Sequence, residues 1–414
     1  MNLFSPILRL FGVGGLSSND KGNQVPASSS ISTDSGISVS NERAMRVSAV
    51  WACVQYITNS VASLPLTFYD KTNEGREEVD RNHYLNRLFN IQPNALMKAR
   101  DFRKAMTFQM CLWQNAYAEI TWAGNRPVAL MPLRPGRMVP FITNDGELQY
   151  HYSTSGGVHV YEKKSILHLK GFGSDGISGL ERVGFANQTL GLSVSADTYA
   201  AKQFANGGGP GGGGFLTFDE FLTDEQREQA RERYSGMSET AYQKGKLWVL
   251  EGGVKFTPDT LNPDTLQMLE TRRMQLGEIA RFFGVPEVLI GAAVNSSSSW
   301  PASFEQQLLS FLTFTLQDYI DEWESGISYS VVSQKDKGSL IVDHDVSGFI
   351  KMDAKTRASV QSSQVQNGIK TRAEVRKANN DPHIEGTDEL TVQVNLTPAD
   401  QLGDKDATEN TQSA

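Results

Sequence analysis

The chain has 414 residues, of which 39% are hydrophobic and 21% charged, and its formal net charge at pH 7 is -8. That length is more than one hydrophobic core usually fills, so we expect two or three subdomains. Cys53 and Cys111 are the two cysteines, a number that favours a fold without a disulfide framework and leaves a single pair open. No window approaches the roughly 18 uninterrupted apolar residues of a membrane-spanning helix.

The first forty residues predict a flexible arm. Residues 1–11 lack the basic start of a signal peptide and carry Arg9 inside their apolar part. Residues 12–40 are rich in Ser, Gly, Asn and Asp and hold few large apolar side chains, so burial cannot offset the entropy of ordering them.

From Asn41 the pattern changes to helices and then to short strands. A helix is expected up to residue 64, before Pro65. Its apolar face would be formed by Val47, Val50, Trp51, Val54, Ile57 and Val61. A second helix is expected over about 98–113. Six alternating segments follow, at 116–122, 129–133, 138–142, 148–153, 158–161 and 166–170, and the turn residues between them are typical of an antiparallel meander.

Residues 171–176 (GFGSDG) have the GxGxxG spacing of a dinucleotide-binding loop. Such a loop would hold a pyrophosphate at a helix N-terminus and would make the chain a nucleotide-dependent enzyme. The preceding strands form a meander rather than a βαβ unit, however, and Asp197 falls within the next expected helix. A tight structural loop is the favoured interpretation, and the enzyme is kept as the alternative.

Two long helices are expected on either side of an insert. The first spans about 180–204 and ends in the glycine-rich run 206–214. This run is not a phosphate-binding loop of the Walker type, because no Lys-Ser or Lys-Thr pair follows the glycines. The insert holds a charged helix from Thr223 to about residue 237, with Gln226 at capping-box spacing, and strands near 246–250 and 254–257. The second long helix ends at Gly284 and Pro286, which are typical helix stops.

A serine run at 296–299 separates that helix from a further one. The next helix is expected from about Ser303, where Gln306 has capping-box spacing. Its apolar face would be formed by Leu308, Leu309, Leu312, Leu316, Tyr319, Ile320 and Trp323. A hairpin of 328–332 and 339–342 and short helices at 353–366 and 371–379, with Asp353 and Thr371 as N-caps, are expected to follow.

Residues 256–334 carry most of the negative charge. They contain no lysine, and three arginines, Arg272, Arg273 and Arg281, face ten acidic residues, so the segment sums to -7. The acidic residues are Asp259, Asp264, Glu270, Glu278, Glu287, Glu305, Asp318, Asp321, Glu322 and Glu324. A surface that holds nucleic acid tightly would carry lysine and arginine instead.

No catalytic or metal-binding pattern emerges from the sequence. HExxH, paired CxxC and GxSxG are absent, and the six histidines have no metal-ligand spacing. The one suggestive cluster, Asp343, His344 and Asp345, is interpreted as a solvated strand end. We therefore expect no enzyme, no cofactor and no metal.

A set of segments resembles the signature region of the portal proteins of tailed bacteriophages. They are LETRR (269–273), EIARFFGVP (278–286), LIG (289–291), the serine run with Trp300, and EQQ (305–307) through Phe311 to Leu316. The order and spacing of these pieces carry the resemblance, and residues 50–66, 115–117, 131–133 and His168 add to it. The resemblance implies an α+β portal-type subunit with an α/β wing, a two-helix stem, a small α/β clip insert and a C-terminal helical crown, assembled as a ring.

The resemblance also places the domain boundaries. They are a flexible arm (1–40), the wing (41–179), the first stem helix (180–206), the clip (207–263), the second stem helix (264–285), a tunnel loop (286–302), a long helix and hairpin returning to the wing (303–350), the crown (351–399) and a disordered tail (400–414).

The function implied by the resemblance is a dodecameric ring at one capsid vertex of the virion, assembled in the host bacterial cytoplasm, through which double-stranded DNA is packaged and ejected. The implied partners are further copies of the chain, the major capsid protein, the terminase large subunit, a head-tail adaptor and the DNA, without a membrane. DNA-channel loop candidates are Asn295, Ser296, Ser297, Ser298, Ser299 and Trp300. Candidates for partner binding on the clip are Asp224, Glu225, Arg227, Glu228, Arg231 and Glu232.

Overall fold

The computed structural model describes residues 39–73, 75–205, 214–217, 223–230, 255–258, 268–291, 301–346, 354–379 and 381–391. The chain divides into two compact units, one up to Asp345 and the other from Val346. No helix in the described ranges is long and apolar enough to cross a membrane.

The first expected helix is two helices, α2 (Asn41–Ala44) and α3 (Ser48–Ser63). Val50, Val54, Ile57 and Val61 are buried on α3, as the periodicity predicts, and they pack against α5 (Ala99–Trp113). The prediction was wrong for Trp51, whose side chain is 55% exposed. Its place next to Val50 turns it about 100° around the helix axis, away from the buried stripe.

The six predicted strands all exist, but they form two three-stranded antiparallel sheets rather than one meander. One sheet has the order β4 (Arg126–Leu133), β3 (Asn115–Ala123), β8 (Ile166–Lys170), and the other β5 (Met138–Ile142), β6 (Leu148–Thr154), β7 (Gly157–Glu162). The strand β8 pairs with β3, in the register that places Leu169 opposite Ala116. Its residues 166–169 are all buried, and α11 (Gln317–Ser330) packs on it. In the expected meander β8 would instead have been an edge strand next to β7, without this helix to bury its side chains.

A third sheet joins the start of this unit to its end. It has the order β11 (Leu340–His344), β1 (Leu66–Thr72), β2 (Gly75–Glu78), and Val342 lies opposite Phe68. The hairpin expected from 328–332 and 339–342 is therefore wrong. Residues 328–330 complete α11 because Trp323, Ile327 and Val331 are buried at helical spacing, and β11 finds its partner in β1 instead.

The core of this unit is organised around Trp323. Its ring meets Phe89 and Phe102 edge-on, with centroids 6.4 and 6.1 Å apart, and its Nε1 donates a hydrogen bond to Thr107 Oγ1 at 3.2 Å. Trp323 lies on a long helical stretch made of α10 (Pro301–Phe311), the π-helical turn η4 (Leu312–Leu316) and α11. The stretch begins at Pro301, before the expected start at Ser303, because proline suits the first turn of a helix.

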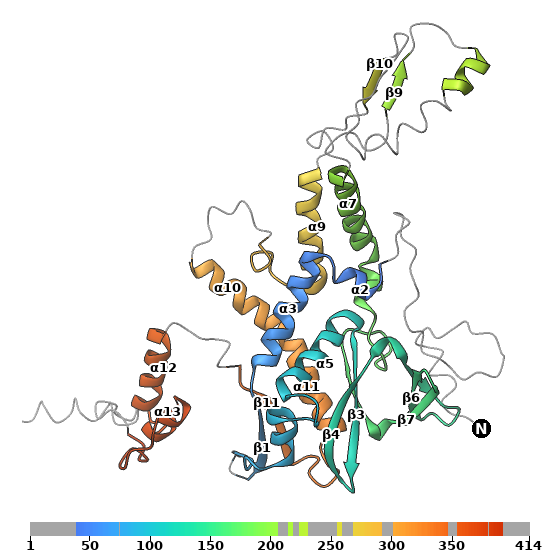
Figure 1. Ribbon diagram of the computed structural model, residues 1–414. Helices are drawn as coiled ribbons and strands as arrows, with labels where there is room; N and C mark the ends of the chain where they lie inside the picture. Colours follow the sequence, from blue (N-terminus) through green and yellow to red (C-terminus); the bar gives the residue numbers. More distant parts are fainter. Residues whose placement is uncertain are drawn as a thin grey trace, which may run out of the picture. The chain divides into compact units, whose positions relative to one another are not determined.

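The stem consists of α7 (Asn187–Ala205) and α9 (Met268–Phe283), which lie side by side (Figure 1). The predicted helix from residue 180 is interrupted, since α6 (Arg182–Phe185) ends before α7 begins. Within the stem, Ser193 Oγ donates to Gln275 Oε1 at 3.3 Å, and both residues are buried. The strands β9 (Gly214–Thr217) and β10 (Lys255–Pro258) pair antiparallel, which confirms the second strand predicted for the insert. The other, at 246–250, lies outside the described residues.

The second unit contains α12 (Ala354–Gln366) and α13 (Arg372–Ala378). Thr371 caps α13 as predicted, and Glu374 completes a reciprocal capping box. Asp353 lies outside the described residues. Short elements elsewhere are α4 (Tyr84–Asn86), η1 (Arg87–Ile91), η2 (Pro135–Arg137) and η3 (Lys163–Ser165).

Candidate functional site

The residues predicted for the DNA channel, Asn295 to Trp300, lie outside the described residues, as do Arg231 and Glu232 of the clip. The remaining clip candidates lie on a described helical segment, 223–230. Thr223 and Gln226 cap this segment reciprocally, through hydrogen bonds of 3.0 and 3.4 Å, as their spacing predicts. Asp224 and Arg227 form an exposed ion pair at 3.2 Å. The segment therefore presents a solvated, mixed-charge face.

The best-defined feature next to the predicted channel loop is the junction that ends α9. Gly284 has a φ of +67°, the left-handed conformation that closes a helix. A Cβ at this position would lie 2.7 Å from Thr315 Oγ1, so a side chain would collide with the neighbouring helix. The Thr315 hydroxyl donates a 2.5 Å hydrogen bond to the Gly284 carbonyl. The end of α9 is thus fastened directly to η4.

The geometry of η4 gives this junction a second distinctive feature. A π-turn inserts an extra residue into a helix, and such turns occur frequently at functional sites. Thr315 lies inside the turn, while Leu312 and Leu316 bury their side chains beneath it. The predicted tunnel loop (286–302) therefore begins directly after the contact between Gly284 and Thr315 and leads into α10, the helix that continues into η4 and Thr315.

Two acidic residues of the electronegative segment turn into the subunit. Glu322 Oε1 accepts a hydrogen bond from the Lys170 backbone N–H at 2.7 Å, and burial raises the pKa of its carboxyl. Glu324 Oε1 accepts from both the backbone N–H and the Nδ1 of His344, each at 2.9 Å. Trp323 lies between them in sequence and is fully buried. The charge of -7 counted for residues 256–334 is thus not all available to line a channel.

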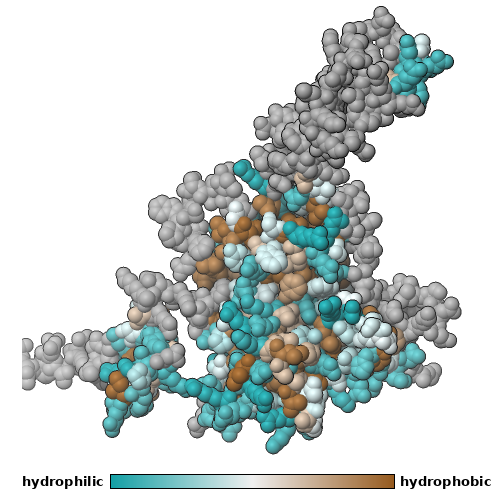
Figure 2. Space-filling model, in the orientation of Figure 1, coloured by the Kyte–Doolittle hydropathy of each residue, from teal (hydrophilic) through white to brown (hydrophobic). Residues whose placement is uncertain are grey.

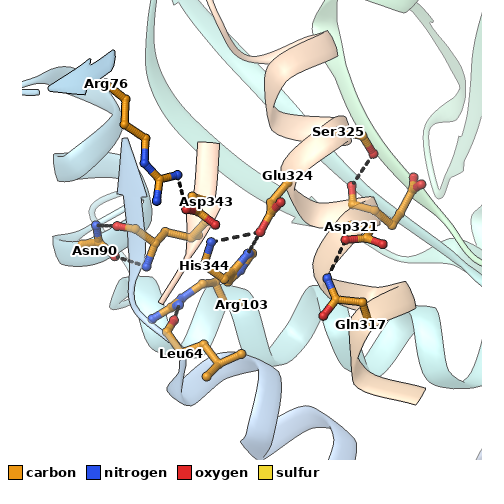
Figure 3. Close-up of polar contacts among 12 residues, drawn as sticks. Leu64, Arg76, Asn90, Arg103, Gln317, Asp321, Glu324, Ser325, Asp343 and His344 are labelled. Atoms are coloured by element: carbon orange, nitrogen blue, oxygen red, sulfur yellow. Dashed lines mark hydrogen bonds and ion pairs between the residues drawn. The ribbon is translucent and has the colours of Figure 1, made fainter. Parts of the chain in front are cut away.

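Figure 3 shows the polar cluster that holds β11 in place. His344 is buried with its side chain against Glu324, so the expectation of a solvated strand end was wrong for this residue. Next to it Asp343 pairs with Arg76 at 2.8 Å, and the Arg103 guanidinium donates to the Leu64 carbonyl. No group of three potential metal ligands is present in the described part of the chain.

The first amides of the loop with GxGxxG spacing are bonded within the protein rather than open to a ligand. Gly171 N–H donates to the Gln114 carbonyl and Phe172 N–H to Gln114 Oε1, both at 2.8 Å. Asp175 Oδ1 accepts from the N–H groups of Ile177 and Ser178 at 2.8 and 2.9 Å. A phosphate loop needs free N–H groups at the start of a helix, whereas the N–H groups of Gly171 and Phe172 are bonded to Gln114 and the next helix, α6, begins only at Arg182. The tight structural loop was the better interpretation.

The comparisons with known proteins agree with this arrangement. A family model described as phage portal protein matches residues 48–380. The chain belongs to the phage portal protein family. It is 35% identical over 369 residues to the portal protein of Enterobacteria phage HK97, with 88% of this chain and 86% of that protein covered. A probable portal protein of Streptomyces phage phiC31 is 28% identical over 354 residues, covering 83% of this chain and 76% of the relative.

Solved structures share the portal fold. An HK97-family phage portal protein from Corynebacterium diphtheriae superposes with a TM-score of 0.55 at 12% identity, covering 76% of this chain and 98% of the other. A chain from the neck of a native gene transfer agent particle, computed with C12 symmetry, gives a TM-score of 0.56 at 20% identity and covers 88% of this chain and 97% of the other. The α+β portal-type fold expected from the sequence is confirmed.

The portal wing also contains a buried polar network that the sequence did not reveal. His168 Nε2 lies 3.0 Å from Asn115 Oδ1 and His168 Nδ1 lies 3.2 Å from the Tyr150 hydroxyl. An amide oxygen only accepts, so Nε2 carries the proton and Nδ1 accepts from the tyrosine. The His168 ring stacks on Tyr117 with centroids 4.3 Å apart, and burial lowers the His168 pKa well below its ordinary value. A single histidine in the middle of a short strand gave no signal for this pairing.

Proposed function

We propose that this portal protein assembles into a closed ring of twelve head-to-tail copies at one capsid vertex of the virion. In this proposal double-stranded DNA passes through the ring during packaging and ejection, the major capsid protein surrounds it, and assembly takes place in the host bacterial cytoplasm. The C12 symmetry of the gene transfer agent neck supports the number twelve, and the membership of the portal family supports the conduit.

The observation that carries the ring is the apolar surface left uncovered on a single subunit. Phe314 is 80% exposed, Met274 69% and Trp51 55%, on η4, α9 and α3. Figure 2 shows apolar surface gathered over α3, α9 and α10. Burying one fully exposed large apolar side chain contributes roughly 1.5–3 kcal/mol, and these three are only partly exposed, so covering them supplies roughly 3–6 kcal/mol per interface against the cost of association. When such a surface meets a different surface on the next copy, the contact is head-to-tail, and it gives a closed ring where the rotation between copies closes.

Substitutions on this surface test the ring. Met274→Asp combined with Phe314→Asp should yield monomers in native mass spectrometry and electron microscopy, because charge would then be buried at each interface. Leu96→Asp is the matched control: its side chain is 77% exposed, but it belongs to the wing loop before α5. Intact rings from the double variant, or wild-type protein that forms only monomers or twofold dimers at high concentration, would contradict the proposal.

The clip is proposed to dock the terminase large subunit during packaging and a head-tail adaptor afterwards. Its described helical segment, 223–230, offers exposed charges of both signs, which suit partners that exchange. The energy would come from that motor, since the chain is proposed to have no nucleotide-dependent activity of its own. Reversing Asp224 and Glu228 to lysine should abolish motor binding while rings persist. Retained binding would remove the clip from the interface, and NAD or ATP binding to the isolated protein would reopen the enzymatic alternative.

Within the proposed conduit, Asn295, Ser296 to Ser299 and Trp300 are proposed to meet the DNA. Short neutral hydroxyl and amide groups hydrogen-bond phosphates weakly, which would favour sliding over gripping. Replacing the four serines with lysine should slow packaging without preventing ring assembly. Packaging at the normal rate in that variant would show that the loop does not touch the DNA.

A further inference from the structure

Tyr329 is an exposed tyrosine with two lysine ammoniums near its ring, on a chain whose net charge is negative. Tyr329, in the last turn of α11, is 60% exposed. The ammonium of Lys163 lies 4.9 Å from the centroid of its ring and that of Lys337 lies 5.5 Å away. Lys337 Nζ also donates to the Tyr329 carbonyl at 2.7 Å. Two cations and one ring, brought together from η3, α11 and the turn before β11, therefore form a compact surface cluster.

Within the described residues, the ammoniums of this cluster are not held by carboxylates in ion pairs. Lys163, Lys170 and Lys337 form no ion pair with the residues that the structure describes. Nearby acids have other partners: Glu162 pairs with Lys164 at 2.8 Å, and Asp336 accepts from Ser333 Oγ at 2.9 Å. The Glu322 carboxylate accepts from the backbone N–H of Lys170, while the Lys170 ammonium donates to the Gly176 carbonyl at 2.7 Å.

The positive charges around Tyr329 change the pKa of its phenol. A hydrogen bond from Lys163 and the charges of Lys163, Lys337 and Lys170 lower the pKa of the Tyr329 phenol, although partial burial opposes the shift. A local positive potential thus persists on a chain with a net charge of -8. Lysine ammoniums bind phosphate as point charges, and an exposed aromatic side chain beside them offers contact to a sugar or base without regard to sequence.

We propose that Lys163, Lys170 and Lys337 around Tyr329 bind the phosphate backbone of nucleic acid on the wing of this portal protein. The site goes beyond the proposed conduit, because it lies on η3, β8 and α11 rather than in the segment 292–300. Nucleic acid is favoured over an acidic protein segment because Tyr329 is 60% exposed beside the cations, where a base or sugar adds contact that a carboxylate side chain does not provide. The contacts are independent of base sequence, as lysine–phosphate contacts are.

Salt dependence gives the size of the expected effect. Three lysine–phosphate contacts per copy correspond to a slope of about -2.7 in log K against log salt, which is about a 40-fold loss of affinity between 50 and 200 mM salt. Fluorescence anisotropy with a random-sequence duplex and the full-length protein measures this slope. Lys163→Gln combined with Lys337→Gln should reduce its magnitude by about 2 per copy bound.

A matched control lies next to the site in sequence. Lys164→Gln removes the same charge from the same turn, but that lysine is paired with Glu162, so the slope should change little. Equal losses from Lys164→Gln and from the double variant would overturn the proposal, since the binding would then follow net charge alone. Binding of polyglutamate as tight as that of the duplex would overturn it in favour of an acidic protein partner.

A second readout follows Tyr329 directly. Bound phosphates neutralise the lysines, so duplex DNA should raise the Tyr329 pKa in a ring-carbon NMR titration, with Tyr329→Phe identifying the signal. An unchanged Tyr329 pKa at saturating DNA would place the binding elsewhere. Ring assembly is measured separately by native mass spectrometry. Monomeric wild-type protein that retains the Lys163- and Lys337-dependent slope would contradict the ring while leaving this site standing.

Discussion

Gly284→Ala is the sharpest test of the junction between α9 and η4. The φ of +67° disfavours any residue with a Cβ, which costs roughly 1–2 kcal/mol for an L-residue in the left-handed region. The new methyl group would also lie 2.7 Å from Thr315 Oγ1 and would displace the hydroxyl that binds the Gly284 carbonyl. Losing that hydrogen bond adds about 0.5–1.5 kcal/mol, so we expect the free energy of unfolding to fall by about 2–3 kcal/mol.

The two parts of this loss can be separated with a double-mutant cycle in urea. Thr315→Ala removes the hydrogen bond and also makes room for the methyl group of Gly284→Ala. The combination of Gly284→Ala with Thr315→Ala should therefore lose less than the sum of its parts, leaving mainly the left-handed strain of about 1–2 kcal/mol. If Gly284→Ala lowered the free energy of unfolding by less than about 0.5 kcal/mol, or if the effects of the two substitutions were fully additive, the contact between Gly284 and Thr315 would not stabilise the protein as argued.

Three further predictions concern the wing and its core. Trp323→Phe leaves the buried Thr107 hydroxyl without its donor and should lower the free energy of unfolding by about 1–3 kcal/mol in urea denaturation, with part of the loss recovered by adding Thr107→Val. His168 stays neutral in the folded protein, while the unfolded chain takes up a proton below a pH of about 6.5. The free energy of unfolding should therefore decrease as the pH is lowered below that value, by up to about 1.4 kcal/mol per pH unit, and His168→Asn should flatten that slope. Glu322→Gln keeps an acceptor for the Lys170 N–H but removes a half-buried carboxylate whose pKa is raised by burial. The thermal midpoint of unfolding at pH 7 should therefore stay the same or rise, and a clear fall would contradict the role given to burial.

Local signals in the sequence predicted local structure well. The capping box of Thr223 with Gln226, the N-cap at Thr371 and the helix stop at Gly284 each depend on residues within one turn of the chain, and each was confirmed. The resemblance to the portal family gave the fold class, because the order of several short segments is specific even when their structure is not known.

Pairings between distant segments could not be read in the same way. Alternation marks β8 and β11 as strands but does not choose β3 and β1 as their partners, since that choice depends on which faces other elements cover. The hairpin failed for this reason: residues 328–332 alternate acceptably as a strand, yet Ile327 and Val331 complete a helical stripe that begins with Trp323. The sequence of this segment fits both the two-residue period of a strand and the 3.6-residue period of a helix, and packing against neighbouring elements decided for the helix.

Counting charges along the chain has the same limitation for function. Ten acids between residues 256 and 334 suggest a repulsive channel wall, but Glu322 and Glu324 flank a buried tryptophan and hold the backbone N–H groups of β8 and β11. Of the charges on α9, Glu278 is paired with Arg281 on the helix surface. A repulsive lining would therefore depend on acids such as Asp318 and Asp321, exposed on α11, more than on the net count. The same reasoning applies in reverse at Tyr329, where a few unpaired lysines create a positive site that the total charge of the chain conceals.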